Sequence, residues 1–141
     1  MPKTTVPKEA AALLAEGWIY LDVRSIPEFD AGHPAGAVNV PLSHQLNGRM
    51  SPNPDFQRVI EANFPKDAKI VVGCKAGARS MQAAALMEAA GYTDVVVMRG
   101  GFHGERDNFG RASVHGWATE GLPVEMTCEP QNAYAKLSEK K

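Results

Sequence analysis

Short apolar runs alternate with helical segments along this chain, and that alternation constrains the fold more than any other feature of the sequence. Three runs have the length and composition of buried strands: residues 18–23, 69–73 and 94–98. Helical spacing of apolar residues, or a run of good helix formers, marks three other segments: residues 7–16, 54–64 and 80–90. Strands that alternate with helices require right-handed crossovers, so the pattern predicts a doubly wound α/β domain with a parallel sheet between two helical layers.

Length and composition narrow the class of protein further. At 141 residues the chain has the size of one ordinary domain, with 44% hydrophobic and 22% charged residues. A net charge of -1 argues against nucleic-acid or acidic-membrane partners. No apolar run approaches the roughly 20 residues that span a bilayer, and residues 1–12 lack the basic-then-apolar order of a signal peptide. The expected location is therefore the cytoplasm.

The cysteines and histidines do not form a metal site of familiar spacing. Cys74 and Cys128 are far apart in the sequence, and the four histidines are scattered. We therefore expect neither a metal nor another cofactor. We expect a single domain over residues 1–128, followed by a polar tail at 129–141 that is frayed or loosely docked.

The stretch that carries chemical information is a strand, a cysteine, a short loop and a helix. Cys74 follows the predicted strand 69–73, at the edge of the sheet where α/β proteins bind ligands. Small residues follow at Ala76, Gly77 and Ala78, and they allow successive backbone N–H groups to point inward at one spot. A loop of this kind, closed by the first turn of a helix, is a cradle for an anion.

The same arrangement activates the cysteine. A helix N-terminus contributes about half a positive charge, and Lys75 and Arg79 add formal charges, so all three favour the thiolate form of Cys74. A thiolate is a nucleophile, and the loop amides would stabilise negative charge on the group that it attacks. The alternative is that Cys74 is a small buried hydrophobic residue, as a lone cysteine often is. The two basic neighbours favour the nucleophile, because an apolar core has no use for them.

At these residues the sequence resembles the rhodanese family, and the likeness covers nearly the whole chain. Three blocks carry it in the family's order: LDVRSIPEFDAGHPAGAVNVP at 21–41, the loop from Cys74 to Arg79 with Ser80 after it, and 95–101 with Trp117 and Gly-Leu-Pro-Val at 121–124. The resemblance implies a central parallel sheet of five strands. It also implies a thiosulfate sulfurtransferase, in which Cys74 takes the outer sulfur of thiosulfate or of a persulfide donor. The Cys74 persulfide then passes this sulfur to a thiophilic acceptor, such as cyanide or a thiol.

The resemblance also assigns roles to the loop. Backbone N–H groups would hold the sulfur and the transferred anion, and they come from Lys75, Ala76, Gly77, Ala78, Arg79 and Ser80. The side chain of Lys75 would attract the sulfonate end of thiosulfate. Arg79 either faces the anion or pins the loop by bonding outward, and the sequence leaves both open. The implied partners are small sulfur compounds and a sulfur-acceptor protein, with no nucleic acid and no membrane.

Four charged or titratable residues of the first block are candidates for a supporting role. Asp22, Arg24 and Glu28 match buried or semi-buried charged positions of the family, and the structural interpretation is that they orient the loop from beneath. The alternative is a direct part in catalysis. His33, in the Gly-His turn, is interpreted as a structural hydrogen-bonding residue, with a general base as its alternative.

Two other functions use the same fold. Phosphatases of the Cdc25 type have five residues between the cysteine and the arginine, whereas this chain has four, which is one residue short of a phosphate cradle. A non-catalytic interaction domain is the other alternative, and an intact cysteine loop argues against it.

The chain departs from the short rhodaneses in one place. Residues 102–116 separate the Gly-Gly after the last strand from Trp117, and this insert should lie on the same side as Cys74. Our hypothesis is that Arg106 or Arg111 in the insert influences the choice of donor or partner. Cys128 is interpreted as an inert thiol, with a redox role as its alternative.

Overall fold

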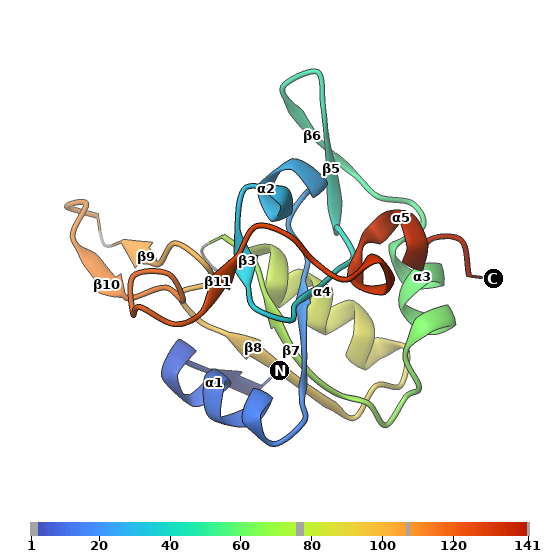
Figure 1. Cartoon of the computed structure of the whole chain (residues 1–141), viewed down its shortest axis with the longest axis horizontal. Coiled ribbons are helices and arrows are strands. Elements are labelled where there is room, and N and C mark those ends of the chain that lie inside the picture. The colour runs from blue at the N-terminus through green and yellow to red at the C-terminus, as the bar shows by residue number, and fades with distance from the viewer. Residues whose placement is uncertain (1–2, 76–77, 107, 141) are drawn as a thin grey trace.

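Five parallel strands form the central sheet of this protein. The computed structural model describes residues 3–75, 78–106 and 108–140 (Figure 1). The strands lie in the order β1 (Lys3–Thr5), β8 (Asp94–Met98), β7 (Lys69–Gly73), β2 (Ile19–Asp22) and β4 (Val38–Asn39), and every neighbouring pair is parallel. The predicted five-stranded doubly wound sheet is therefore confirmed. β1 was not expected, because three residues at an edge have no periodicity of their own and are ordered by pairing with β8.

Alternate side chains of the strands pack into two separate hydrophobic clusters, one on each face of the sheet. Val71 faces the side of α1 (Pro7–Ala15), where Ala10 is fully buried. Its neighbours Ile70 and Val72 face the opposite side. That side is covered by α3 (Phe56–Asn63) and α4 (Ala78–Ala89), and Figure 1 shows the two helical layers. The period-two alternation of side chains in a strand produces this division.

Two segments between β2 and α3 complete the N-terminal half. α2 (Ile26–Asp30) is one short helix in which Ser25 and Glu28 form a capping box. β5 (Ser43–Leu46) and β6 (Arg49–Pro52) form a hairpin that projects from the body (Figure 1). This hairpin was not predicted, although its turn, Asn47-Gly48, is a recognised signal. Both turn residues have positive φ, 51° and 77°, as a type I′ turn requires.

The C-terminal tail packs more firmly than the sequence suggested. We expected residues 129–141 to be frayed or loosely docked, but they contain η1 (Pro130–Asn132) and α5 (Tyr134–Leu137). Leu137 is 8% exposed and belongs to the same cluster as α3. Asn63 donates to the backbone oxygen of Leu137 at 2.9 Å, and Asn53 donates to the hydroxyl of Tyr134 at 3.2 Å. Two apolar anchors within a polar segment are enough to dock it.

Two further short strand pairings lie outside the central sheet in the described part of the chain. β3 (His33–Pro34) pairs antiparallel with β11 (Val124–Glu125), and β9 (Glu105–Arg106) pairs antiparallel with β10 (Ala112–Val114). The second pair lies within the insert 102–116. Within the described residues, no helix combines the length and the apolar character needed to cross a membrane.

Candidate active site

Cys74 directly follows β7, at the carboxyl end of the central strand of the sheet. Its side chain is 2% exposed and belongs to the cluster under α4. The Cys74 Sγ atom accepts a hydrogen bond from the backbone N–H of Ser80 at 3.4 Å, and it lies 3.4 Å from the Ser80 hydroxyl. Ser80 is in the first turn of α4, so the sulfur meets the positive end of that helix.

The structure describes four of the six loop residues that were predicted to bind substrate. Ala76 and Gly77 lie outside the described residues. Lys75 and Ala78 are exposed, Arg79 is half-buried and Ser80 is buried. The folded chain therefore brings Ser80 to Cys74, and the substrate-binding role of the loop stays a prediction.

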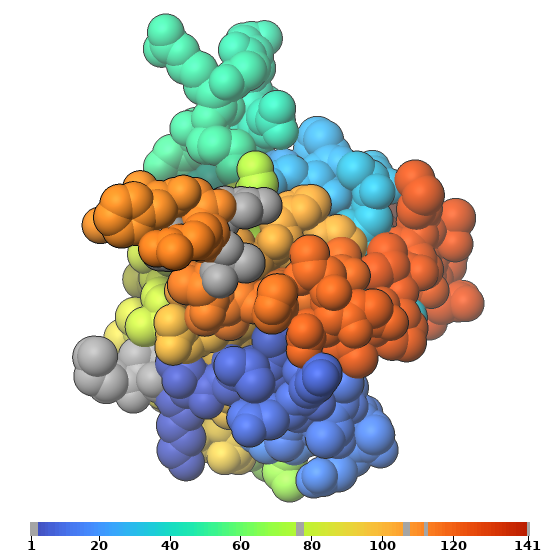
Figure 2. Space-filling model, turned by 90° about the vertical axis from the view of Figure 1, so that its left-hand side faces the viewer, coloured from blue at the N-terminus to red at the C-terminus, as the bar shows by residue number. Residues whose placement is uncertain are grey.

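The start of the insert is hydrogen-bonded to the cysteine loop. The N–H of Phe102 donates to the Cys74 carbonyl at 2.7 Å, and the N–H of His103 donates to the Lys75 carbonyl at 2.9 Å. Phe102 was not singled out from the sequence, and His103 was noted only as one residue of an insert that could form a rim over the pocket. Their position right after Gly100-Gly101, which ends the neighbouring strand, is the signal that could have found them. In Figure 2 the teal β5–β6 hairpin projects at the top of the molecule, and the orange β9–β10 segment lies below it.

Gly101 allows this close approach. Its φ is +55°, and an added Cβ would lie 2.4 Å from the Cys74 carbonyl oxygen and 2.7 Å from the Lys75 carbonyl carbon. Backbone on both sides leaves no flexible atom to move aside. Only glycine therefore fits between the insert and the loop.

Replacing Gly101 with alanine is expected to lower the free energy of unfolding by about 2–4 kcal/mol, because the loop must shift to relieve the contact. Gly121→Ala is the matched control, since Gly121 has φ +75° and nothing within 4 Å of an added Cβ. Its cost should stay near 1 kcal/mol, the ordinary penalty of a left-handed alanine. Urea denaturation of both variants measures the difference. Equal costs would mean that the backbone contact has no energetic consequence.

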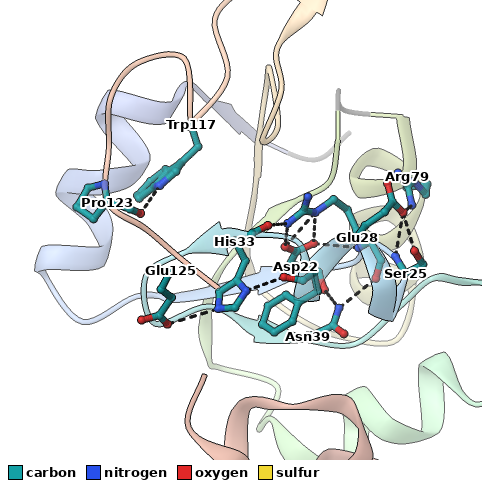
Figure 3. Close-up of polar contacts among 12 residues, drawn as sticks. Asp22, Ser25, Glu28, His33, Asn39, Arg79, Trp117, Pro123 and Glu125 are labelled. Carbon is teal, nitrogen blue, oxygen red and sulfur yellow. Dashed lines mark hydrogen bonds and ion pairs between the residues drawn. The ribbon is translucent and has the colours of Figure 1, made fainter. Parts of the chain in front are cut away.

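Arg79 points to a carboxylate. Its Nη1 donates to Oε1 of Glu28 at 2.7 Å, and its Nη2 donates to Oε2 at 3.0 Å (Figure 3). Ser25 donates to the same carboxylate through its N–H and its hydroxyl, at 3.1 and 2.9 Å. Arg79 thus ties the first turn of α4 to α2, which favours the loop-pinning alternative over direct contact with an anion.

The pair also controls the ionisation of Glu28. Burial alone would raise the pKa of this carboxyl, but hydrogen bonds from Arg79 and Ser25 outweigh it and hold the pKa at about 2, below the ordinary 4.5. A carboxyl with a lowered folded pKa contributes stability that is fully present above the unfolded value. That contribution is lost as the pH falls through 4.5 towards 2.

We therefore expect the stability difference between wild type and Glu28→Gln to shrink between pH 5 and pH 2. Near neutral pH the wild type should be more stable by on the order of 2 kcal/mol, after allowance for solvent screening of this partly exposed pair. Chemical denaturation at a series of pH values measures both proteins. A difference that does not change with pH would show that the charge of Glu28 does not stabilise the fold.

Asp22 and Arg24 form a buried ion pair beside β4. Their side chains are each 2% exposed. Arg24 Nε and Nη2 donate to the Asp22 carboxylate at 3.0 and 2.8 Å, and Nη2 also donates to the Gly32 carbonyl at 2.7 Å. Asn39 donates to the carbonyls of both residues at 3.0 Å. The guanidinium lies 4.5 Å from the centre of the Phe102 ring, so it also contacts the insert.

His33 lies within a different set of contacts. It is 1% exposed and stacks on Phe29 with 3.7 Å between ring centres. Its Nδ1 is 2.8 Å from the Phe29 carbonyl, and its Nε2 is 3.2 Å from the Thr127 carbonyl and 3.5 Å from the Glu125 carboxylate (Figure 3). These contacts join β3 to the C-terminal segment, and they favour the structural interpretation over a general base.

A recess of about 190 Å³ opens beside the cysteine loop. We call it the Arg24 recess, and its walls include Arg24, Glu28, Lys75, Phe102 and His103. The imidazole of His103 lies edge-on to the Phe102 ring at 5.1 Å. Burial lowers the pKa of His103, and the charges of Arg24 and Lys75 lower it further. The recess is therefore lined by two cations, by the Glu28 carboxylate and by an imidazole whose pKa is lowered.

The other candidates of the sequence analysis lie elsewhere. Arg111 lies over the ring of Phe109, 5.3 Å from its centre, in the exposed part of the insert. The side chain of Arg106 is outside the described atoms, so the hypothesis on donor choice stays a prediction. Cys128 packs against the α1-side cluster, and burial, followed by the charges of Asp30, Glu125 and Glu129, raises its pKa. A raised pKa argues against a reactive thiol at that position.

Comparison with known proteins is consistent with this geometry. The family described as Rhodanese-like domain matches residues 6–106. Senescence-associated protein DIN1 of Raphanus sativus is 40% identical over 100 residues, which cover 70% of this chain but only 55% of that protein. Thiosulfate sulfurtransferase 16, chloroplastic, of Arabidopsis thaliana is 36% identical over 124 residues, covering 88% of this chain and 93% of that protein. The crystal structure of Rv0390 from M. tuberculosis has a TM-score of 0.72 at 26% identity, and covers 89% of this chain and 98% of that one.

Proposed function

The chain belongs to the rhodanese-like domain family, and from that premise we propose that it is a thiosulfate-type sulfurtransferase that works through Cys74. The observation that carries the proposal is the placement of the Cys74 sulfur against the first-turn N–H of α4. A helix N-terminus favours the thiolate, and the thiolate is the reactive form. The printed name of the Arabidopsis relative, a thiosulfate sulfurtransferase, supports the same reaction class.

In the proposed reaction the Cys74 thiolate attacks the outer sulfur of thiosulfate. A new S–S bond forms to Cys74 while the sulfur–sulfur bond of thiosulfate breaks, and sulfite leaves with the electron pair. Three negative charges enter this step and three leave it, divided between the Cys74 persulfide and sulfite. In the second step a thiophilic acceptor such as cyanide takes the terminal sulfur, thiocyanate leaves and the thiolate is restored.

The other residues around the loop position it. The N–H of Ser80 donates to the reacting sulfur, while Arg79 is held by Glu28 and so keeps the start of α4 in place. The hydrogen bonds from Phe102 and His103 fix the carbonyls of Cys74 and Lys75. These two hydrogen bonds hold the backbone of Cys74 and Lys75 in place beside the start of the insert.

Intact-mass analysis after incubation with thiosulfate tests the proposal. We expect the wild type to gain the mass of one sulfur atom, to lose it again on addition of cyanide, and to release sulfite and thiocyanate in equal amounts. A chromogenic phosphate ester should give no product, because the loop is one residue too short for phosphate. Release of phenolate from the ester without any gain of sulfur would overturn the proposal in favour of a phosphatase.

A further inference from the structure

A groove of about 720 Å³ lies between α3, α4 and the base of the β5–β6 hairpin. We call it the α4 groove, and its apolar walls are Leu42, Pro52, Pro54, Phe56, Ala85 and Leu86. The other described residues that line it are polar and neutral, so none of them carries a charge. The volume is in the range of ordinary ligand sites. None of the described walls belongs to the cysteine loop, so this groove is separate from the site described above.

One face of the β5–β6 hairpin extends the α4 groove away from the body of the protein (Figure 1). Ser43 lies opposite Pro52 in the antiparallel register, and Met50 is two positions from Pro52 in the same strand, so the three side chains share a face. Ser43 and Pro52 line the groove, and Met50, which is 47% exposed, comes next along that face. On the other face, the His44 ring lies edge-on to Tyr134 of α5. The apolar surface therefore continues beyond the pocket, which favours an extended occupant over a compact small molecule.

The α4 groove and the cysteine loop share one helix. Gln82, Ala85 and Leu86 are three and four positions apart, so they form one stripe of α4 along the groove. Arg79 precedes Gln82 by three positions, in the same first turn whose N–H donates to the Cys74 sulfur. An occupant of the groove therefore lies beside the helix whose first turn faces the sulfur.

The walls of the α4 groove select an uncharged and mainly apolar occupant. A charged group placed there would lose its hydration, and no described lining residue carries an opposite charge to compensate. Leu86 is 49% exposed and Met50 is 47% exposed, so an occupant that covers them removes apolar surface from water. The amide groups of Gln57 and Gln82 can exchange hydrogen bonds with a peptide backbone. A two-stranded hairpin is only marginally stable by itself, so a partner packed on it also stabilises it.

We propose that the α4 groove docks an uncharged, apolar peptide segment of a protein that accepts sulfur from Cys74. The inference deepens the proposed function, on which its role in sulfur transfer rests. In the transfer step a cysteine thiolate of the acceptor attacks the outer sulfur of the Cys74 persulfide. A new S–S bond forms to the acceptor cysteine, the S–S bond to Cys74 breaks, and the electron pair stays on the Cys74 thiolate. The acceptor leaves as a persulfide, and the step consumes neither an oxidant nor a reductant.

Two cysteine peptides with blocked ends are the probes for this groove. One carries Leu-Ala-Leu beyond a short glycine spacer of varied length, and the other carries Glu-Ala-Lys at the same place, so neither has a net charge. We expect the apolar peptide to accept sulfur with a kcat/KM about tenfold higher, because the groove partly buries its two leucines. Leu86→Lys and Met50→Lys should each bring this ratio close to one. Both variants should keep the rate of transfer from thiosulfate to cyanide, because cyanide has no group that fills the groove.

Leu46→Lys is the matched control, since Leu46 is 57% exposed and lies on the other face of the same hairpin. It should keep the preference for the apolar peptide. A wild type without this preference, or a preference that survives both Leu86→Lys and Met50→Lys, would overturn the inference. Loss of cyanide activity in the two groove variants would overturn it as well, because the groove would then support the loop instead of docking an acceptor.

A version of the apolar peptide with serine in place of its cysteine separates the inference from the proposed function. We expect it to cause saturable shifts in the amide NMR signals of Ser43, Gln82 and Leu86, and these shifts require no sulfur transfer. Such binding in a wild type that moves no sulfur to cyanide would contradict the proposed function and leave the groove as a peptide-docking site. Sedimentation of the wild type tests another occupant. A dimer that Leu86→Lys dissociates would assign the groove to a second copy of the chain and overturn the inference.

Discussion

Replacing Cys74 with serine is expected to abolish sulfur transfer from thiosulfate to cyanide, with a loss of at least about a thousandfold. The serine hydroxyl is not ionised at neutral pH, and its oxygen cannot form the persulfide on which both steps depend. The fold should stay intact, because the serine hydroxyl is slightly smaller than the thiol. It can take the place of Sγ, which lies 3.4 Å from the N and Oγ atoms of Ser80. Sulfite and thiocyanate release measure the loss, and a denaturation curve checks the fold.

Cys128→Ser is the matched control for this prediction. Cys128 is the second free cysteine, it packs on the opposite face of the sheet from the Cys74 cluster, and its pKa is raised. The variant should keep wild-type rates. If Cys74→Ser kept activity while Cys128→Ser lost it, Cys128 would be the sulfur carrier and the proposed function of the loop would be wrong.

Replacing Asp22 with alanine is expected to lower the free energy of unfolding by about 3–5 kcal/mol, because it leaves the Arg24 guanidinium buried without its counter-ion. Arg24 is 2% exposed, and the Gly32 carbonyl and the Phe102 ring are the contacts that would remain. With a neutral side chain at position 22, solvent therefore cannot compensate the charge of Arg24. Urea denaturation at neutral pH measures the loss.

The double variant Asp22→Leu/Arg24→Met separates the charge from the packing. Apolar residues of similar volume often replace a buried ion pair with little loss, so the double variant should recover most of the stability that Asp22→Ala loses. A double variant as unstable as Asp22→Ala would mean that the hydrogen bonds of the pair, and not the unpaired charge, account for the cost.

The two ion pairs have different relations to the loop. Both terminal nitrogens of Arg79 donate to the Glu28 carboxylate. The pair of Glu28 and Arg79 therefore holds α4 against α2. Arg24 instead donates to Asp22 through Nε and Nη2.

The sequence by itself determined the layers of the fold, and it singled out Cys74 as the candidate nucleophile. Strands 69–73 and 94–98 are found with the bounds predicted, because each is a continuous apolar run whose side chains are buried on both faces. Helix 80–90 was predicted from its composition and begins two residues earlier, at Ala78. Cys74 could be identified because its neighbours along the chain, the small residues and the two cations, are themselves the chemical signal.

Only the tertiary structure decided how those cations are used. Arg79 had two open roles, and the choice depends on Glu28, which lies 51 positions away in the sequence and reaches it through the packing of α2 on α4. The contacts of Phe102 and His103 with the cysteine loop, and of the Arg24 guanidinium with the Phe102 ring, likewise join segments that are far apart in the sequence. Periodicity and propensity describe what a segment does with its own neighbours. A hydrogen bond between distant segments has no local signal, because it forms only after the sheet has brought their ends together.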